Sequence, residues 1–158
     1  MAAELADLLE KRGAPYAVLD LDWLAWFHTG TEGQGAPTDL GMLVRNLAPV
    51  VGNYLSIGIR FFVLAFAVRD RSELERLRRA VPMPLRVVRL TVPIAEIERR
   101  LHTDVTSGRR DDMREAASWM STGEGEGVED VALSNDRLIR AVAVDIFEWL
   151  GWCRDEHR

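Results

Sequence analysis

Two aspartates that close a short apolar run are the first residues in the chain with informative chemistry. The run starts at Tyr16, and Asp20 and Asp22 stand at its end. A carboxylate in that place can accept the proton of a substrate hydroxyl or hold Mg²⁺ through water. Solvation of a strand end and helix capping explain the same residues, so both interpretations stay open. Trp23 and Trp26 follow directly. They either line an acceptor pocket or pack in the hydrophobic core.

Arginine supplies nearly all the positive charge, because Lys11 is the only lysine among 20 basic residues. Five arginines gather in one polar stretch beside several acids: Arg99, Arg100, Arg109, Arg110 and Arg114. Guanidinium groups match phosphate oxygens and stabilise the charge that develops in phosphoryl transfer. A solvated surface held by salt bridges gives the same composition. Arg109 is our first candidate for a phosphate contact.

Length and composition predict one globular domain over residues 1–158. The 158 residues are 47% hydrophobic and carry a formal charge of −5, which argues against disorder and against partnership with nucleic acid or a membrane surface. Cys153 is the only cysteine and the three histidines are scattered, so we expect neither a disulfide nor a metal site. With no signal-peptide pattern at Met1, the sequence predicts a cytoplasmic protein.

Apolar periodicity alternates between helical and extended along the chain. Gly13 predicts a helix end, Ser72–Glu75 fits a capping box, and the continuous apolar run 60–68 predicts a strand buried on both faces. Helices are predicted over 2–12, 39–54, 72–80, 93–101, 111–120 and 135–150, and strands over 16–22, 60–68, 85–92 and 128–133. Alternating strands and helices predict an α/β fold with parallel strands and helices on both faces, a three-layer α/β/α architecture.

Two glycine-rich segments, 30–35 and 123–127, are interpreted as flexible loops. The first does not directly follow a strand, and the second carries Glu124 and Glu126, which would repel phosphate. No histidine pairs with a serine or cysteine motif, so the sequence shows no hydrolase triad.

Four segments, in this order, resemble the P-loop kinases of small molecules, a group that includes adenylylsulfate, shikimate and gluconate kinases. They are Leu19-Asp20-Leu21-Asp22, the strand ending in Arg69-Asp70, the stretch from Leu90-Thr91-Val92-Pro93 to Gly108-Arg109-Arg110, and Leu133-Ser134-Asn135-Asp136. The resemblance implies a P-loop-kinase-like fold with a lid over about 99–114, and transfer of the γ-phosphoryl of ATP, with Mg²⁺, to a small hydroxyl-bearing acceptor.

Roles for individual residues also follow from the resemblance. Asp22 would orient the acceptor and Arg109 would neutralise charge. The acceptor would contact further residues, namely Asp20, Trp23, Trp26, Arg100 and Arg110. Asn135 and Asp136 would lie beside the adenine, although capping of the last helix explains them as well.

The sequence departs from this family at its phosphate-binding loop. No G-x-x-x-x-G-K-S/T motif occurs, and Met1 to Ala6 resembles the helix that follows that loop. The strand before the loop lies in the middle of the family's sheet, so its absence leaves about four strands and a gap of roughly 10 Å. The strands close up, a partner fills the gap, or the chain is incomplete; we favour the third hypothesis, with a native start upstream of Met1.

The sequence thus predicts a kinase in its complete form that is inactive without the missing loop. The alternative is a non-catalytic nucleotide-binding or interaction module derived from such a kinase. Exposed strand edges beside the gap would favour association, including a homo-oligomer. A receiver-like module using Asp20 and Asp22 is a weaker alternative, because no lysine ends a later strand.

Overall fold

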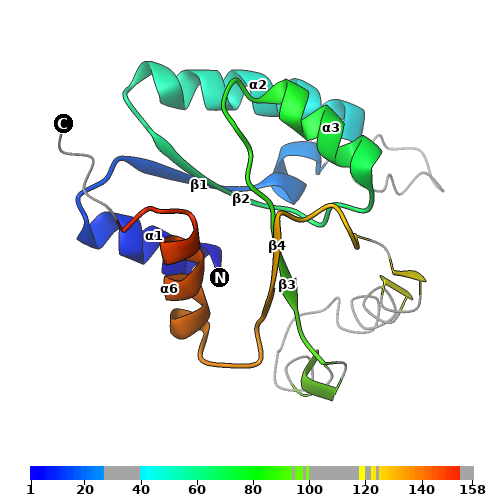
Figure 1. Cartoon of the computed structure of the whole chain (residues 1–158). Coiled ribbons are helices and arrows are strands. Elements are labelled where there is room, and N and C mark those ends of the chain that lie inside the picture. The colour runs from blue at the N-terminus through cyan, green and yellow to red at the C-terminus, as the bar shows by residue number, and fades with distance from the viewer. Residues whose placement is uncertain are drawn as a thin grey trace.

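The fold is that of a small α/β protein with helices on both sides of short parallel strands (Figure 1). The structure is a computed structural model of the chain, and it describes residues 1–26, 40–93, 95–97, 99, 118–119, 122–123 and 125–153. The helices are α1 (Ala2–Lys11), the 3-10 helix η1 (Leu21–Ala25), α2 (Leu40–Ser56), α3 (Arg71–Ala80) and α6 (Ile139–Trp149). The strands are β1 (Tyr16–Asp20), β2 (Phe61–Ala65), β3 (Val88–Thr91) and β4 (Val131–Ser134).

The four described strands form two separate parallel pairs. β1 pairs with β2, with Tyr16 opposite Phe61, and β3 pairs with β4, with Val88 opposite Val131. The parallel direction confirms the prediction from the alternating pattern. β2 and β3 are not hydrogen-bonded to each other, so the four strands do not close up into one sheet.

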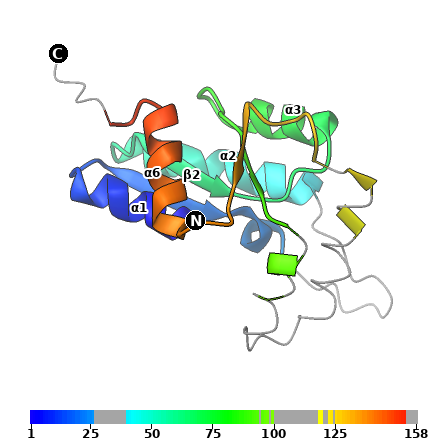
Figure 2. The same cartoon turned by 60° about the horizontal axis from the view of Figure 1, so that its bottom comes forward.

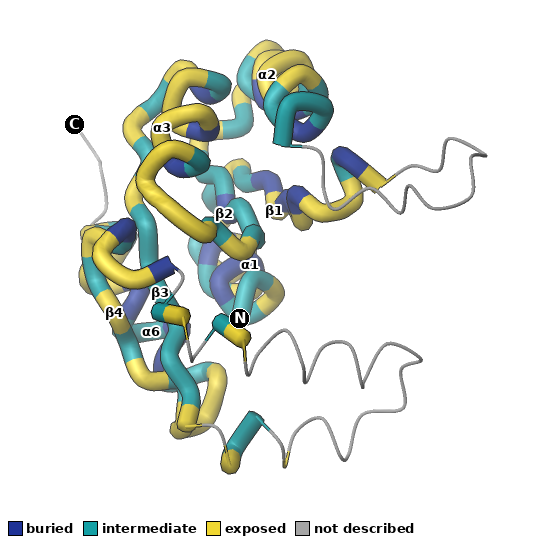
Figure 3. The backbone as a smooth tube through the Cα atoms, turned by 90° about the vertical axis from the view of Figure 1, so that its right-hand side faces the viewer, coloured by how far each residue is buried: buried dark blue, intermediate teal, exposed yellow. Residues whose placement is uncertain are grey.

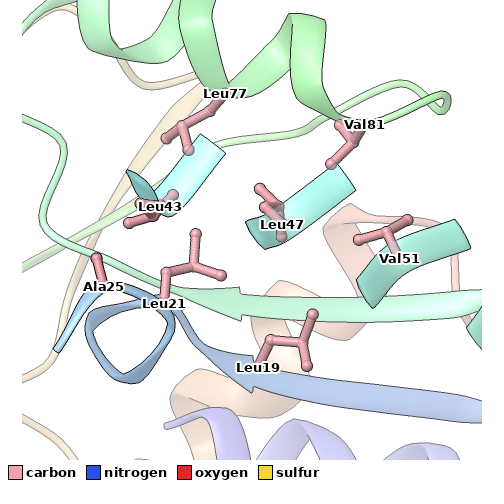
Figure 4. Packing of buried hydrophobic residues seen from close by; sticks show 8 residues of the cluster. All are labelled: Leu19, Leu21, Ala25, Leu43, Leu47, Val51, Leu77 and Val81. Atoms are coloured by element: carbon pink, nitrogen blue, oxygen red, sulfur yellow. The ribbon is translucent and has the colours of Figure 1, made fainter. Parts of the chain in front are cut away.

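Two apolar clusters hold helices against opposite faces of the strands. The first joins β1 and η1 to α2 and α3 through fully buried side chains such as Leu43, Leu47 and Val51 (Figure 4). The second joins α1 to α6 and β2 around Leu9 and Val142. α1 and α6 lie side by side (Figure 2), so the predicted three-layer arrangement is present.

Helix ends follow local signals, with two corrections. Gly13 has φ +68° just after α1, and its N–H donates to the Glu10 carbonyl at 2.8 Å, which confirms the predicted glycine cap. α3 begins earlier than predicted, because the Asp70 carboxylate accepts from the Glu73 N–H at 2.9 Å and takes the capping role assigned to Ser72. α6 begins at Ile139 rather than residue 135.

The strand β2 is less buried than its sequence predicts. Only Val63 is buried, and the other residues of β2 are half-buried, as are all those of β3 (Figure 3). The prediction of burial on both faces assumed that helices cover both faces of the strand. Helices do lie on both sides, but β2 is hydrogen-bonded along one edge only and its other edge borders a cavity, which is why its side chains keep contact with solvent.

Among the described residues, no helix combines the length and the apolar character needed to cross a membrane.

Candidate functional site

A cavity of about 1340 Å³ separates the two strand pairs. Every residue of β2 and of β3 lines it, and side chains of α1, α3 and α6 contribute to its walls. The cavity therefore lies between the two apolar clusters, in the middle of the fold, and Asp22, two residues after the end of β1, also lines it. In open α/β sheets ligands bind at the carboxyl ends of the strands, which makes this edge of the cavity the candidate site.

The two aspartates after β1 have different surroundings. β1 ends at Asp20, two residues before its predicted end, because the Asp20 carboxylate turns back and accepts the Asp22 N–H at 3.2 Å. Asp20 thereby caps the 3-10 helix η1. Asp22 sits in the first turn of η1 and lines the cavity, so its carboxylate is the better placed of the two for contact with a ligand there.

The tryptophans after Asp22 lie on the surface. Trp23 is 66% exposed and Trp26 is 72% exposed, and their ring centroids are 4.5 Å apart. They therefore do not belong to the core, which removes one of their two interpretations. Neither is among the residues that line the cavity, so a role in acceptor binding stays a prediction.

Most of the predicted lid falls outside the described residues, including Arg100, Arg109, Arg110 and Arg114. Arg99 is described, and it forms a two-point ion pair with Glu96, with both N–O distances 2.7 Å. That hydrogen bond, together with the Glu96 charge, raises the pKa of Arg99. The pairing is within one turn of helix, which is typical of a solvated surface arginine.

The residues after β4 connect the ends of two strands. The Asn135 N–H donates to the Thr91 carbonyl at 2.8 Å, which continues the β3–β4 ladder by one step. Asp136 is exposed. Leu138 precedes α6 without a side-chain cap, so neither residue caps that helix. Their predicted place beside an adenine stays a prediction.

Gly125 makes a close contact that its sequence did not reveal. It is buried, and its N–H donates to the Arg69 carbonyl at 2.8 Å. A Cβ at this position would lie 2.9 Å from the Val68 carbonyl oxygen and 3.2 Å from the Trp119 ring. The segment 123–127 was interpreted as a flexible loop, yet here Gly125 attaches it to the chain just after β2. In the sequence, the G-x-G-x-G spacing shortly after Trp119 was the signal that could have indicated this contact.

An ion-pair network links β3 to the segment between this loop and β4. Arg89 on β3 lies 3.1 Å from the Glu129 carboxylate and 3.6 Å from that of Glu126. The Val87 N–H donates to the Asp130 carboxylate at 2.7 Å. A backbone hydrogen bond from its own N–H, and then the Arg89 charge, lower the pKa of Glu129 against the opposing effect of desolvation. These contacts therefore favour the ionised form of Glu129.

The described residues do not provide a cradle for a nucleotide triphosphate. They include no group of three or more His, Cys, Asp or Glu side chains placed to hold a metal. Lys11 lies in the last turn of α1, while Met1 and Ala2 at the other end line the cavity. Ten helical residues span about 15 Å, so this lysine cannot reach phosphates bound at the start of α1. ATP and Mg²⁺ therefore do not fit the described residues alone.

Three solved structures with a similar fold are kinases. A sugar kinase from Janibacter sp. HTCC2649 superposes with a TM-score of 0.67 at 19% identity, over 96% of this chain and 86% of that one. The APS kinase CysC of Mycobacterium tuberculosis, in complex with AMPPNP and APS, gives 0.56 at 16% identity, over 95% and 88%. A gluconokinase from Sinorhizobium meliloti 1021 gives 0.54 at 18% identity, with the same coverage.

No family model matches the chain, and no curated protein matches it. The likeness to the three kinases extends over nearly all of the chain, whose described part has parallel strands with helices on both faces. The resemblance that the sequence suggested is thus confirmed at the level of the fold: the chain has the fold of the P-loop kinases.

Proposed function

We propose that this domain belongs to an ATP-dependent kinase that phosphorylates a small hydroxyl-bearing molecule. The position of Asp22 carries the proposal, because it lines the central cavity at the carboxyl end of β1 in a chain with a kinase fold. A carboxylate within hydrogen-bond reach of an acceptor hydroxyl orients it and takes up its proton. The acceptor's apolar surface rests on Trp23 and Trp26.

The phosphate-binding part of the reaction needs residues that the 158-residue sequence lacks. It contains no G-x-x-x-x-G-K-S/T motif and one lysine. In this proposal the complete protein supplies that loop, ATP and Mg²⁺ bind there, and the reaction takes place in the cytoplasm. The lid 99–114 belongs to the same single domain, in which Arg109 neutralises the transferred group, Arg100 and Arg110 bind substrate, and Asn135 and Asp136 adjoin the adenine.

A phosphotransfer assay tests this proposal. The gene is expressed in its source cells with its own upstream sequence, and the purified product is incubated with γ-labelled ATP, Mg²⁺ and a panel of sugars, sugar acids and adenylyl sulfate. We expect transfer to one acceptor class, and Asp22→Asn should lower kcat roughly 10²- to 10⁴-fold. Asp7→Asn, at an exposed carboxylate on α1, is the matched control and should leave kcat unchanged.

Two results would contradict the proposal. One is robust Mg²⁺-dependent turnover by the 158 residues alone, since that would need a phosphate site of another kind. The other is full activity of the Asp22→Asn variant in a protein that does transfer phosphate. Absence of transfer to every acceptor, with an intact mass equal to that of the 158 residues, would favour the second candidate function.

The second candidate is a non-catalytic binding or interaction module. The observation that favours it is the open gap between β2 and β3, because a fold that keeps two unpaired edges has a surface for a partner. Binding of AMPPNP without turnover would separate a nucleotide-binding module from one that binds only protein.

A further inference from the structure

Trp119 contributes an aromatic wall to the cavity at a place that no earlier assignment used. It is half-buried and lines the cavity together with Gly125 and Glu126. Its ring atom Cζ3 lies 3.2 Å from the point where Gly125 would carry a Cβ, so the indole rests against the glycine main chain. The Gly123 N–H donates to the Trp119 carbonyl at 3.0 Å. The tryptophan is therefore held both at its ring and at its main chain.

This tryptophan lies near the point where the chain leaves β2. The Gly125 N–H donates to the carbonyl of Arg69, which follows the end of β2 at Ala65. Ligands of open α/β sheets bind beyond the carboxyl ends of the strands, so Trp119 stands on the side of the cavity where a ligand is expected. Trp23 and Trp26 do not line the cavity, so they would meet an acceptor only at its outer side.

Two carboxylates line the cavity close to the indole, and a neighbour orients each of them. Glu73, in the first turn of α3, accepts the Arg69 N–H at 2.8 Å through Oε2. Glu126 comes directly after Gly125, and its carboxylate lies 3.6 Å from the Arg89 guanidinium. Carboxylate oxygens accept hydrogen bonds from hydroxyl groups, so both side chains can bind a compound that carries several hydroxyls.

The charges around the indole offset one another. The side chains Trp119, Glu73, Glu126, Arg69 and Arg89 all line the cavity, and they are called the Trp119 wall below. Its two carboxylates stand against two guanidinium groups. An anionic ligand would meet the carboxylates and a cationic one the guanidinium groups, each at a cost once water is excluded. Hydroxyl groups both donate and accept, so they match carboxylates and guanidinium groups together.

A ring with one apolar face fits the indole itself. Ligand sites combine apolar and aromatic surfaces with a few well-placed polar groups. A sugar ring carries C–H groups on its faces and hydroxyl groups around its rim, so it can stack on Trp119 while its hydroxyls reach Glu73 and Glu126. Adenine would also stack, but its rim carries several ring-nitrogen acceptors, which the two carboxylates would repel.

We infer that the Trp119 wall is a subsite for the ring of an uncharged sugar. The inference rests on the proposed function, in which Asp22 of the same cavity orients a hydroxyl of the acceptor, and it names the class of that acceptor. The sugar stacks on the indole, and its hydroxyls bind the carboxylates of Glu73 and Glu126. The contacts of Gly125 with Arg69 and Trp119 lie outside the strands, so a strand that the complete protein supplies to the gap leaves these contacts in place.

Fluorine NMR tests the inference without ATP, on the product of the gene expressed with its own upstream sequence. The protein is labelled with fluorotryptophan, and the Trp119 signal is assigned by its loss in the Trp119→Phe variant. The probes are glucose, galactose and mannose, and we expect at least one of them to shift the Trp119 signal. Trp149 on α6 does not line the cavity, so its signal is the internal control and should stay in place.

Two sets of variants separate stacking from charge. Trp119→Ala should weaken binding of the sugar roughly tenfold and Trp119→Phe should keep most of it, while Trp149→Ala is the matched control and should change nothing. Glucuronate, which carries a carboxylate on the same ring as glucose, should bind roughly tenfold more weakly or worse. Glu73→Gln keeps an acceptor oxygen and removes a negative charge, so it should narrow this difference. Glu148→Gln, at an exposed carboxylate of α6, should not.

The outcomes for the subsite and for the proposed function are distinct. An unchanged Trp119 signal in a protein that binds glucose would place the sugar elsewhere and overturn the inference. Equal or tighter binding of glucuronate, unaffected by Glu73→Gln, would overturn the assignment to an uncharged ligand. Phosphotransfer to an acceptor that leaves the Trp119 signal unchanged would overturn the inference and uphold the proposed function. A sugar that shifts the Trp119 signal but is not phosphorylated would uphold the subsite and contradict the proposed function.

Discussion

Replacing Gly125 with alanine should destabilise the protein by about 2–5 kcal/mol, and the structure separates two causes. Gly125 has φ +75°, a left-handed conformation that costs a residue with a Cβ roughly 1–2 kcal/mol. The added Cβ would also lie 2.9 Å from the Val68 carbonyl oxygen. That oxygen belongs to the main chain and cannot rotate away, so relief requires a backbone shift of the kind that costs about 1–3 kcal/mol.

Gly127 provides the matched control two residues further along. Its φ is also +75°, and a Cβ there would meet nothing within 4 Å. Gly127→Ala should therefore show the conformational cost alone, roughly 1–2 kcal/mol. Urea unfolding followed by far-UV circular dichroism measures both variants, and the comparison is valid while the m-value is unchanged. Equal losses for the two variants would refute the close approach of Gly125 to the chain after β2.

Three further predictions test the cap, the core and the ion-pair network. Asp70→Ala should cost about 1 kcal/mol in urea unfolding while Ser72→Ala stays within about 0.5 kcal/mol, and the reverse order would restore the capping box that the sequence suggested. Leu47→Ala, at a fully buried side chain of α2, should cost about 2–5 kcal/mol, and a loss below about 1 kcal/mol would contradict its burial. The lowered pKa of Glu129 beside Arg89 stabilises the fold above the ordinary carboxyl pKa of 4.5, and this contribution disappears as the pH falls through the lowered value. Glu129→Gln should therefore lose stability at pH 7 and flatten the acid side of the stability profile, whereas an unchanged profile would show that the network contributes nothing.

Local signals predicted most of the secondary structure. The periodic leucines before Gly13 end where a left-handed residue can close a helix, and α1 ends there. The choice between two overlapping caps was not predictable, because Asp70-x-x-Glu73 and Ser72-x-x-Glu75 both fit the pattern. In the structure the chain after β2 turns so that Asp70 caps α3. Tertiary packing sets that turn, and the local sequence does not show it.

The sequence named candidate residues for the site but could not give their geometry. Asp20 and Asp22 were assigned together from their place after an apolar run, and the structure separates a capping carboxylate from one that lines the cavity. Gly125 was missed because its requirement comes from the Val68 carbonyl, which is 57 positions away along the chain. Contacts between distant segments leave little trace in a single sequence.

The gap between β2 and β3 and the carboxylate proposed to bind the acceptor lie at the same cavity. Asp22 lines the same cavity as both unpaired strand edges, so a segment bound there would share its walls with the carboxylate assigned to the acceptor. Filling the gap removes solvent from this cavity, and a charge interaction in a site with less water is stronger. The stability of β2, only one residue of which is buried, and the electrostatics around Asp22 should therefore respond together to an occupant. If the β2 amides of a longer native chain are protected from exchange while phosphotransfer is no faster than with the 158 residues, then filling the gap and forming the acceptor site are separate.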